Sequence, residues 1–179
     1  FTGDLPQDIT VNCDAIPPVP TLSAMDNCGS ATVTYAERGT EGGCSGNGGI
    51  IRTWTAKDAC GNEMIHTQTI TVQDTTKPEI IGTPQDISVS CGSEVPEASI
   101  ENVRATDNCS GEVHISVSDA IGEQTCANKY IIIRTWTAKD ACGNESSSSQ
   151  RIEVNDTIRP MFTGDLPQDI TVNCDAIPP

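Results

Sequence analysis

Short stretches of alternating apolar and polar residues run along the chain, separated by clusters of glycine, proline, asparagine and aspartate. These stretches, for example 9–11, 32–35, 51–55 and 67–72, are rich in threonine, valine and isoleucine, which favour β-strands. No segment has the 3.6-residue period of a helix. The pattern predicts an all-β protein, and several short strands in about 80 residues are typical of immunoglobulin-like β-sandwiches.

Two nested repeats organise the chain. Residues 162–179 repeat residues 1–18 letter for letter, which defines a period of 161 residues. Inside this period, the run RTWTAKDACGNE at 52–63 returns at 134–145. We therefore predict an immunoglobulin-like unit at 1–78 (unit A), a second at 79–160 (unit B) and the truncated start of another unit A at 161–179. The sequence is expected to be a piece of a longer, elongated array.

The tryptophans of the repeated run, Trp54 and Trp136, are predicted to anchor the two cores. The alternative is an exposed aromatic residue that binds a ligand. The strand face that carries Trp54 also carries Arg52, whose stem is expected to pack beside the indole. A purely apolar core does not explain a guanidinium group at this position.

The composition excludes several classes of protein. Asp and Glu number 25 against 10 Lys and Arg, giving a formal charge of −15 that disfavours nucleic acid as a partner. No apolar run approaches the roughly 20 residues of a membrane-spanning helix. The two histidines, His66 and His114, have no counterpart in the other unit, and no nucleophile or phosphate-loop motif occurs. We therefore expect that the protein is not an enzyme.

Cysteine is abundant, with nine residues, whereas the core is poor in aromatic side chains. Each unit has four cysteines, and Cys174 copies Cys13 in the truncated unit. Four cysteines allow three pairings. The wide spacings do not match the close pairs of a zinc site. We therefore expect disulfides that staple small domains in an oxidising, extracellular compartment.

The ordered motifs PQDI, DNC, RTWTAKDACGNE and V-x-D-T-x-x-P resemble the HYR-type (hyalin-repeat) immunoglobulin-like module. More narrowly, they are similar to its cysteine-containing version in long, repetitive surface adhesins of Bacteroidota-type bacteria. The resemblance spans essentially the whole chain. It implies an exported, non-catalytic repeat at the cell surface, and it identifies no ligand.

The strand order of this family implies which cysteines are neighbours. It places the DNC and DACGN turns at one end of a unit, and the first strand and the third cysteine at the other end. The implied pairs are Cys13–Cys44 and Cys28–Cys60 in unit A, and Cys91–Cys126 and Cys109–Cys142 in unit B.

The same strand order implies a cluster of oxygen ligands at the joint between units, which suits calcium. The candidate ligands are Asp74, Asp107, Asn108, Asp140, Asn144 and Glu145, with Asp156 serving the next joint. The alternative is that these residues are there because they form turns.

Thr75 and Thr157, in the D-T segments of the joints, resemble O-glycosylation acceptors of exported Bacteroidota-type proteins. In a eukaryotic host, the sequons at Asn108, Asn144 and Asn155 would be the acceptors instead.

The favoured function is a structural or adhesive stalk segment of a repetitive surface protein or filament. Its partners would be neighbouring repeats of the same chain, with polysaccharide or a cell surface bound through a tip elsewhere. The alternative is that the repeats themselves bind polysaccharide or a partner cell surface, which glycan-array binding by a two-unit fragment would reveal.

Overall fold

The computed structural model describes residues 1–44, 47–109 and 111–173, so Cys174 lies outside the described residues. The described residues form strands and no helix. The strands are β1 (Ile9–Asn12), β2 (Thr32–Glu41), β3 (Gly48–Lys57), β4 (Glu63–Gln73), β5 (Glu79–Ile81), β6 (Ile87–Ser90), β7 (Arg104–Thr106), β8 (Val113–Cys126), β9 (Lys129–Asp140) and β10 (Glu145–Asn155). The all-β prediction is confirmed.

Each unit is built on a four-stranded sheet, and the two sheets have the same strand order. The order is β1-β4-β3-β2 in unit A and β6-β10-β9-β8 in unit B. The first strand of each unit pairs in parallel with the last, with Ile9 opposite Ile70 and Ile87 opposite Ile152. The remaining pairs are antiparallel hairpin partners. The internal sequence repeat is therefore a repeat of sheet topology.

A much thinner second layer faces each sheet. In unit B it consists of the short antiparallel strands β5 and β7. In unit A, the described residues of the corresponding region form only isolated bridges, Thr2 to Ser23 and Met25 to Ser30. The units are immunoglobulin-like sandwiches in which extended segments replace most of the second sheet.

The two tryptophans anchor the cores as predicted, with exposed fractions of 2% for Trp54 and 1% for Trp136. Ile70 and Ile152 in the final strands are also fully buried. Alternating buried and exposed positions along β4 and β10 show that one face of each sheet packs inward while the other faces water.

Buried arginines connect the sheet to the thin layer. Arg134 on β9 is buried and donates to both carboxylate oxygens of Asp119, each at 2.8 Å, and to the carbonyl oxygen of Glu97 at 3.2 Å. Arg52 makes the equivalent contacts in unit A, to a carboxylate of β2 and to the Pro17 carbonyl oxygen. The guanidinium groups thus satisfy carbonyl oxygens of the extended segments, which lack ladder partners. This explains the arginine on the tryptophan face.

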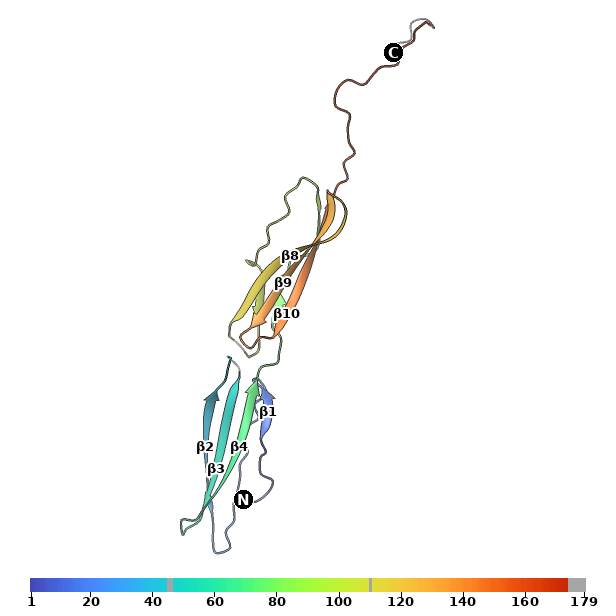
Figure 1. Ribbon diagram of the computed structural model, residues 1–179. Helices are drawn as coiled ribbons and strands as arrows, with labels where there is room; N and C mark the ends of the chain where they lie inside the picture. The colour runs from blue at the N-terminus through green and yellow to red at the C-terminus, as the bar shows by residue number, and fades with distance from the viewer. Residues whose placement is uncertain (45–46, 110, 174–179) are drawn as a thin grey trace.

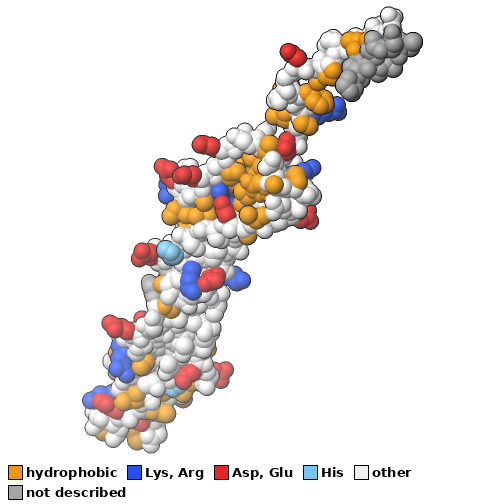
Figure 2. All heavy atoms as spheres, turned by 45° about the horizontal axis from the view of Figure 1, so that its top comes forward, with side chains coloured by type: hydrophobic (Ala, Val, Ile, Leu, Met, Phe, Trp, Pro, Cys, Tyr) orange, Lys and Arg blue, Asp and Glu red, His pale blue; other side chains and the backbone are white. Residues whose placement is uncertain are grey.

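The two units follow one another end to end, and the C-terminal segment extends beyond unit B (Figure 1). Carboxylate side chains are distributed along the face shown in Figure 2, in keeping with the net charge of −15. Within the described residues, no helix has the length and apolar character needed to cross a membrane. The fold therefore presents an elongated, acidic array.

We expect Asp119→Asn to lower the free energy of unfolding by about 1–2 kcal/mol at neutral pH, because it leaves the buried Arg134 without its counter-charge. The Asp119 side chain is 37% exposed, so water replaces part of the interaction. Hydrogen bonding to Arg134 lowers the pKa of Asp119, so its contribution is present above the unfolded pKa and is lost as the pH falls through the folded pKa. Urea denaturation between pH 7 and pH 2 would measure this difference.

Glu145→Gln provides the matched control in the same unit, because Glu145 pairs with Lys139 on the open surface. Its loss should change stability by less than about 0.5 kcal/mol. Equal effects of the two substitutions would show that Arg134 does not depend on Asp119.

Candidate functional site: the junction between the two units

A short linker, residues 74–78, connects β4 of unit A to β5 of unit B. Side chains of unit A hold its first half in place. The backbone N–H of Asp74 donates to the side chain of Asn47, and the Asn12 amide donates to the hydroxyl of Thr76 at 2.8 Å. The linker is thus an ordered continuation of unit A.

Two disulfides cross this junction on either side of the linker. Cys13, which follows β1, bonds to Cys109, and Cys44, in the β2–β3 connection, bonds to Cys142. The Cα–Cα distances of 5.6 and 5.2 Å lie in the ordinary range for disulfides. Together with the main chain, the bonds give three covalent connections between the units.

Aspartate-anchored turns present the two cysteines of unit B. Asp107 accepts a hydrogen bond from the backbone N–H of Cys109 at 2.8 Å. Asp140 accepts from the backbone N–H groups of Cys142 at 2.9 Å and Asn144 at 2.8 Å. In both motifs, DNC and DACGN, the aspartate two residues earlier therefore fixes the turn that carries the cysteine.

The pairing implied by the family resemblance is wrong. It placed the right cysteines together at each end of a unit, because Cys13 and Cys44 share one end of unit A and Cys109 and Cys142 share the facing end of unit B. It treated each unit as closed, however, whereas a cysteine at the end of a unit also reaches its neighbour. The other predicted pairs, Cys28–Cys60 and Cys91–Cys126, are not formed, and these four cysteines carry free thiols.

Hydrogen bonds add to the disulfides across the junction. The Asn108 amide donates to the carboxylate of Asp14 at 2.8 Å. The Asn144 amide donates to the carbonyl oxygen of Asp74 at 3.3 Å, and the hydroxyl of Ser146 donates to the linker carbonyl of Pro78. Asp14 was not among the predicted site residues, although its place directly after a junction cysteine could have indicated it.

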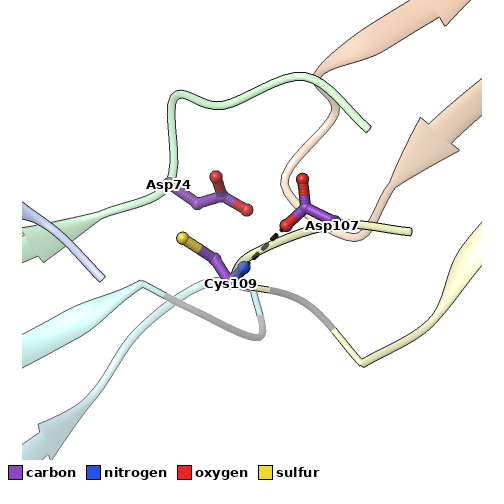
Figure 3. Close-up of side chains that lie close together, drawn as sticks. All are labelled: Asp74, Asp107 and Cys109. Carbon is purple, nitrogen blue, oxygen red and sulfur yellow. Dashed lines mark hydrogen bonds between the residues drawn. The ribbon is translucent and has the colours of Figure 1, made fainter. Parts of the chain in front are cut away.

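An acidic cluster lies beside the disulfide between Cys13 and Cys109. The side chains of Asp74, Asp107 and Cys109 converge there, with candidate ligand atoms within 4.8 Å of one another (Figure 3). The Cys109 sulfur is bonded to Cys13 and is not available to a metal. The geometry therefore leaves the two carboxylates as the oxygen donors of this cluster.

Asp74 is the buried member of the cluster, with 6% of its surface exposed. One carboxylate oxygen accepts from the backbone N–H of Thr76 at 3.1 Å, and the other, Oδ2, is buried without a hydrogen-bond partner. Burial, followed by the negative charges of Asp107, Asp140 and Asp14, raises the pKa of Asp74. The junction therefore holds a carboxylate that is costly to ionise.

The other predicted calcium ligands are engaged elsewhere. Burial alone would raise the pKa of Asp140, but hydrogen bonds from Asn144 and from the turn outweigh it and lower that pKa. Glu145 pairs with Lys139 at 2.8 Å on the surface, and Asp156 accepts from the backbone N–H of Ile158 at 3.2 Å. Asp140 and Asn144 thus have the turn-forming role that was the alternative to calcium binding. Of the predicted calcium ligands, Asp74 and Asp107 are the two that remain as candidates.

Comparison with known proteins places these two units in a described family. Residues 1–72 and 80–154 each match the family described as HYR-like domain with 4 cysteines. A comparison with curated proteins finds no match.

Solved structures similar to the chain are cadherin ectodomains. Drosophila N-cadherin EC1-4 is 17% identical with a TM-score of 0.33, and the match covers 84% of this chain and 48% of that one. Protocadherin gammaB7 EC3-6, in its cis-dimer structure, is 19% identical with a TM-score of 0.34, covering 84% and 46%. Protocadherin Gamma B2 domains 1-5 is 16% identical with a TM-score of 0.35, covering 84% and 38%. The chain spans less than half the length of each of these structures.

We expect Asp74→Asn to raise the free energy of unfolding at pH 7 in the presence of chelator. The folded pKa of Asp74 lies above the unfolded one, so its ionisation weakens the native state as the pH rises through that window. The gain should shrink towards pH 3, where Asp74 is protonated in both states. Urea denaturation across this pH range measures it.

Asp156→Asn is the matched control, because Asp156 holds the equivalent position after β10 and is exposed. It should leave stability nearly unchanged at each pH. A loss of stability in Asp74→Asn that is constant with pH would contradict the assignment of a raised pKa.

Proposed function

Because the chain belongs to the family of HYR-like domains with 4 cysteines, we propose that it is a rigid stalk segment of a repetitive extracellular surface protein or filament. The observation that carries the proposal is the pair of disulfides between successive units. Disulfides persist in oxidising, extracellular surroundings. We propose no catalytic role.

The three connections at the junction restrict bending and twisting. A single linker would act as a hinge, whereas bonds at two further points, one after β1 and one in the β2–β3 connection, fix the orientation of unit B on unit A. The bonds close loops of 96 and 98 residues. By loop-closure entropy each contributes about 4–5 kcal/mol taken alone, although the loops overlap and the contributions do not add fully.

A long, acidic array of such units suits a stalk that projects an adhesive tip or forms an adhesive fibre. The net charge of −15 over one period and the start of the next keeps neighbouring stalks apart by repulsion. In this proposal the direct partners of each unit are its neighbours in the chain. Polysaccharide or a partner cell surface would be bound by a tip outside this segment.

A divalent cation, with calcium as the candidate, is proposed between Asp74 and Asp107. The buried, unpartnered Oδ2 of Asp74 supports it, because such an oxygen gains a partner when a cation binds. Millimolar calcium should then raise the melting temperature over that in chelator, and Asp74→Asn should abolish the rise. Equal melting temperatures in calcium and in chelator would reject the calcium site. The acidic residues at the junction would then have only the turn-forming role.

Glycosylation at Thr75 and Thr157 is proposed as protection of the linkers. Both residues are exposed, as a glycan acceptor must be. Intact mass of the protein from its native source should exceed the sequence mass by whole hexose-type units. A mass equal to that of the bare chain would reject the modification.

The rigidity of the junction can be measured by small-angle X-ray scattering. We expect the oxidised chain to scatter as a stiff rod, whereas serine at Cys13, Cys44, Cys109 and Cys142 should give a broader distribution of distances, because the linker becomes a hinge. Circular dichroism would check that the sheets persist.

Serine at Cys28 and Cys60 is the matched control, because these thiols are free and lie away from the junction. It should leave the scattering unchanged. Identical curves for the oxidised chain and the four-serine variant would refute the rigid stalk.

A further inference from the structure

The four cysteines that are free among the described residues occupy the positions of bonded cysteines in the other unit. Aligning the repeats places Cys28 at the position of Cys109 and Cys60 at that of Cys142. It also places Cys91 at the position of Cys13 and Cys126 at that of Cys44. The outer end of unit A, which faces away from the junction, therefore has the same cysteine positions as the end of unit B that is bonded to unit A. The outer end of unit B has the same cysteine positions as the bonded end of unit A.

The turns that present the outer cysteines of unit A match those of unit B. The backbone N–H of Cys28 donates to Asp26 at 2.8 Å, as that of Cys109 does to Asp107. The backbone N–H of Cys60 donates to Asp58 at 2.9 Å, the distance found in the DACGN turn of unit B. The same local geometry thus points two exposed cysteines out of unit A.

The outer end of unit B likewise matches the bonded end of unit A. Cys91 follows β6, which pairs in parallel with the last strand as β1 does. Cys126 ends β8 at the hairpin equivalent to the one that holds Cys44. The backbone N–H of Cys91 donates to the carbonyl oxygen of Asn155 at 2.8 Å, which places Cys91 at the end of β10. Burial, then the negative charge of Asp156, raise the pKa of its thiol.

We propose that Cys91 and Cys126 form disulfides with the next copy of unit A along the array, the kind of unit that residues 162–179 begin. Cys91 would bond to the cysteine equivalent to Cys28, and Cys126 to the cysteine equivalent to Cys60. Every junction of the array, from A to B and from B to A, would then be crossed by two disulfides. In forming each bond, two thiols lose two protons and two electrons. A disulfide oxidant takes them up and is released as two thiols.

The hydrogen bonds of the observed junction do not all transfer to the second one. Gly92 stands where Asp14 accepts from the Asn108 amide, and Ile158 stands where Thr76 accepts from the Asn12 amide. The cysteines and the aspartates that orient them are retained. The covalent bonds are therefore the feature that the two kinds of junction share.

The test is a tandem chain of two 161-residue periods, secreted into an oxidising compartment and kept as a monomer. Its non-reducing peptide map should contain Cys91–Cys28 and Cys126–Cys60 links besides the two observed pairs. Trypsin leaves Cys13 and Cys28 on one peptide, so a second cleavage before aspartate is needed. Each isolated period has four free thiols. The tandem chain should also have four, because the two new disulfides between the periods use four of the eight thiols and two thiols remain at each outer end.

Position-specific variants provide the controls. Cys28→Ser in the second period should free the Cys91 thiol of the first, whereas Cys28→Ser in the first period should leave all links intact. Eight free thiols, or Cys28–Cys60 and Cys91–Cys126 links within units, would overturn the proposal. The inference rests on the proposed function for the existence of a repetitive array, but the peptide map measures only which cysteines are bonded. A chain that shows these links and yet scatters as a flexible chain would reject the rigid stalk and leave the disulfide proposal intact.

Discussion

The two disulfide bonds across the boundary between units are the constraint on which the rest of the structure depends. They hold the carboxylates of Asp74 and Asp107 close together beside the disulfide at Cys109. Without that restraint, burial and mutual repulsion of these groups would favour separation of the units. The bonds also place stabilisation at the ends of the two sheets, where one unit meets the next.

The interior of each unit explains why such restraint is useful. A single tryptophan and one final-strand isoleucine are the largest fully buried side chains of each sheet. A domain of about 80 residues with so small a core has little stability to spare. The buried arginine offsets part of this deficit by binding the carbonyl oxygens of the extended segments, so that the thin layer needs no complete sheet.

The sequence predicted the fold well because the fold depends on local patterns. Alternation in the strands located the sheets, the repeated run located Trp54 and Trp136, and the motifs DNC and DACGN located the turns. The partners of the cysteines could not be predicted in this way. The strand order implied by the family resemblance indicates which cysteines share the end of a unit, but whether Cys13 bonds to Cys44 or to Cys109 depends on how two units meet. Similarly, the motifs indicated acids near the joint, whereas only the packed junction shows that Asp74 is buried and Glu145 is not.

Pairing across junctions changes how an array carries tension. With the proposed second set of bonds, a pulling force would enter unit A at the cysteines of its outer end and leave at the cysteines bonded to unit B. The shortest stretch of main chain between these two ends is the 15-residue separation of Cys13 and Cys28. Even fully stretched, that path spans only about 50 Å, against about 270 Å for an unlinked unit of about 80 residues. A folded strand of ten residues already spans about 33 Å. Bonds within units, such as Cys13–Cys44, would leave whole linkers free to bend, whereas bonds between units limit both bending and extension with the same four cysteines.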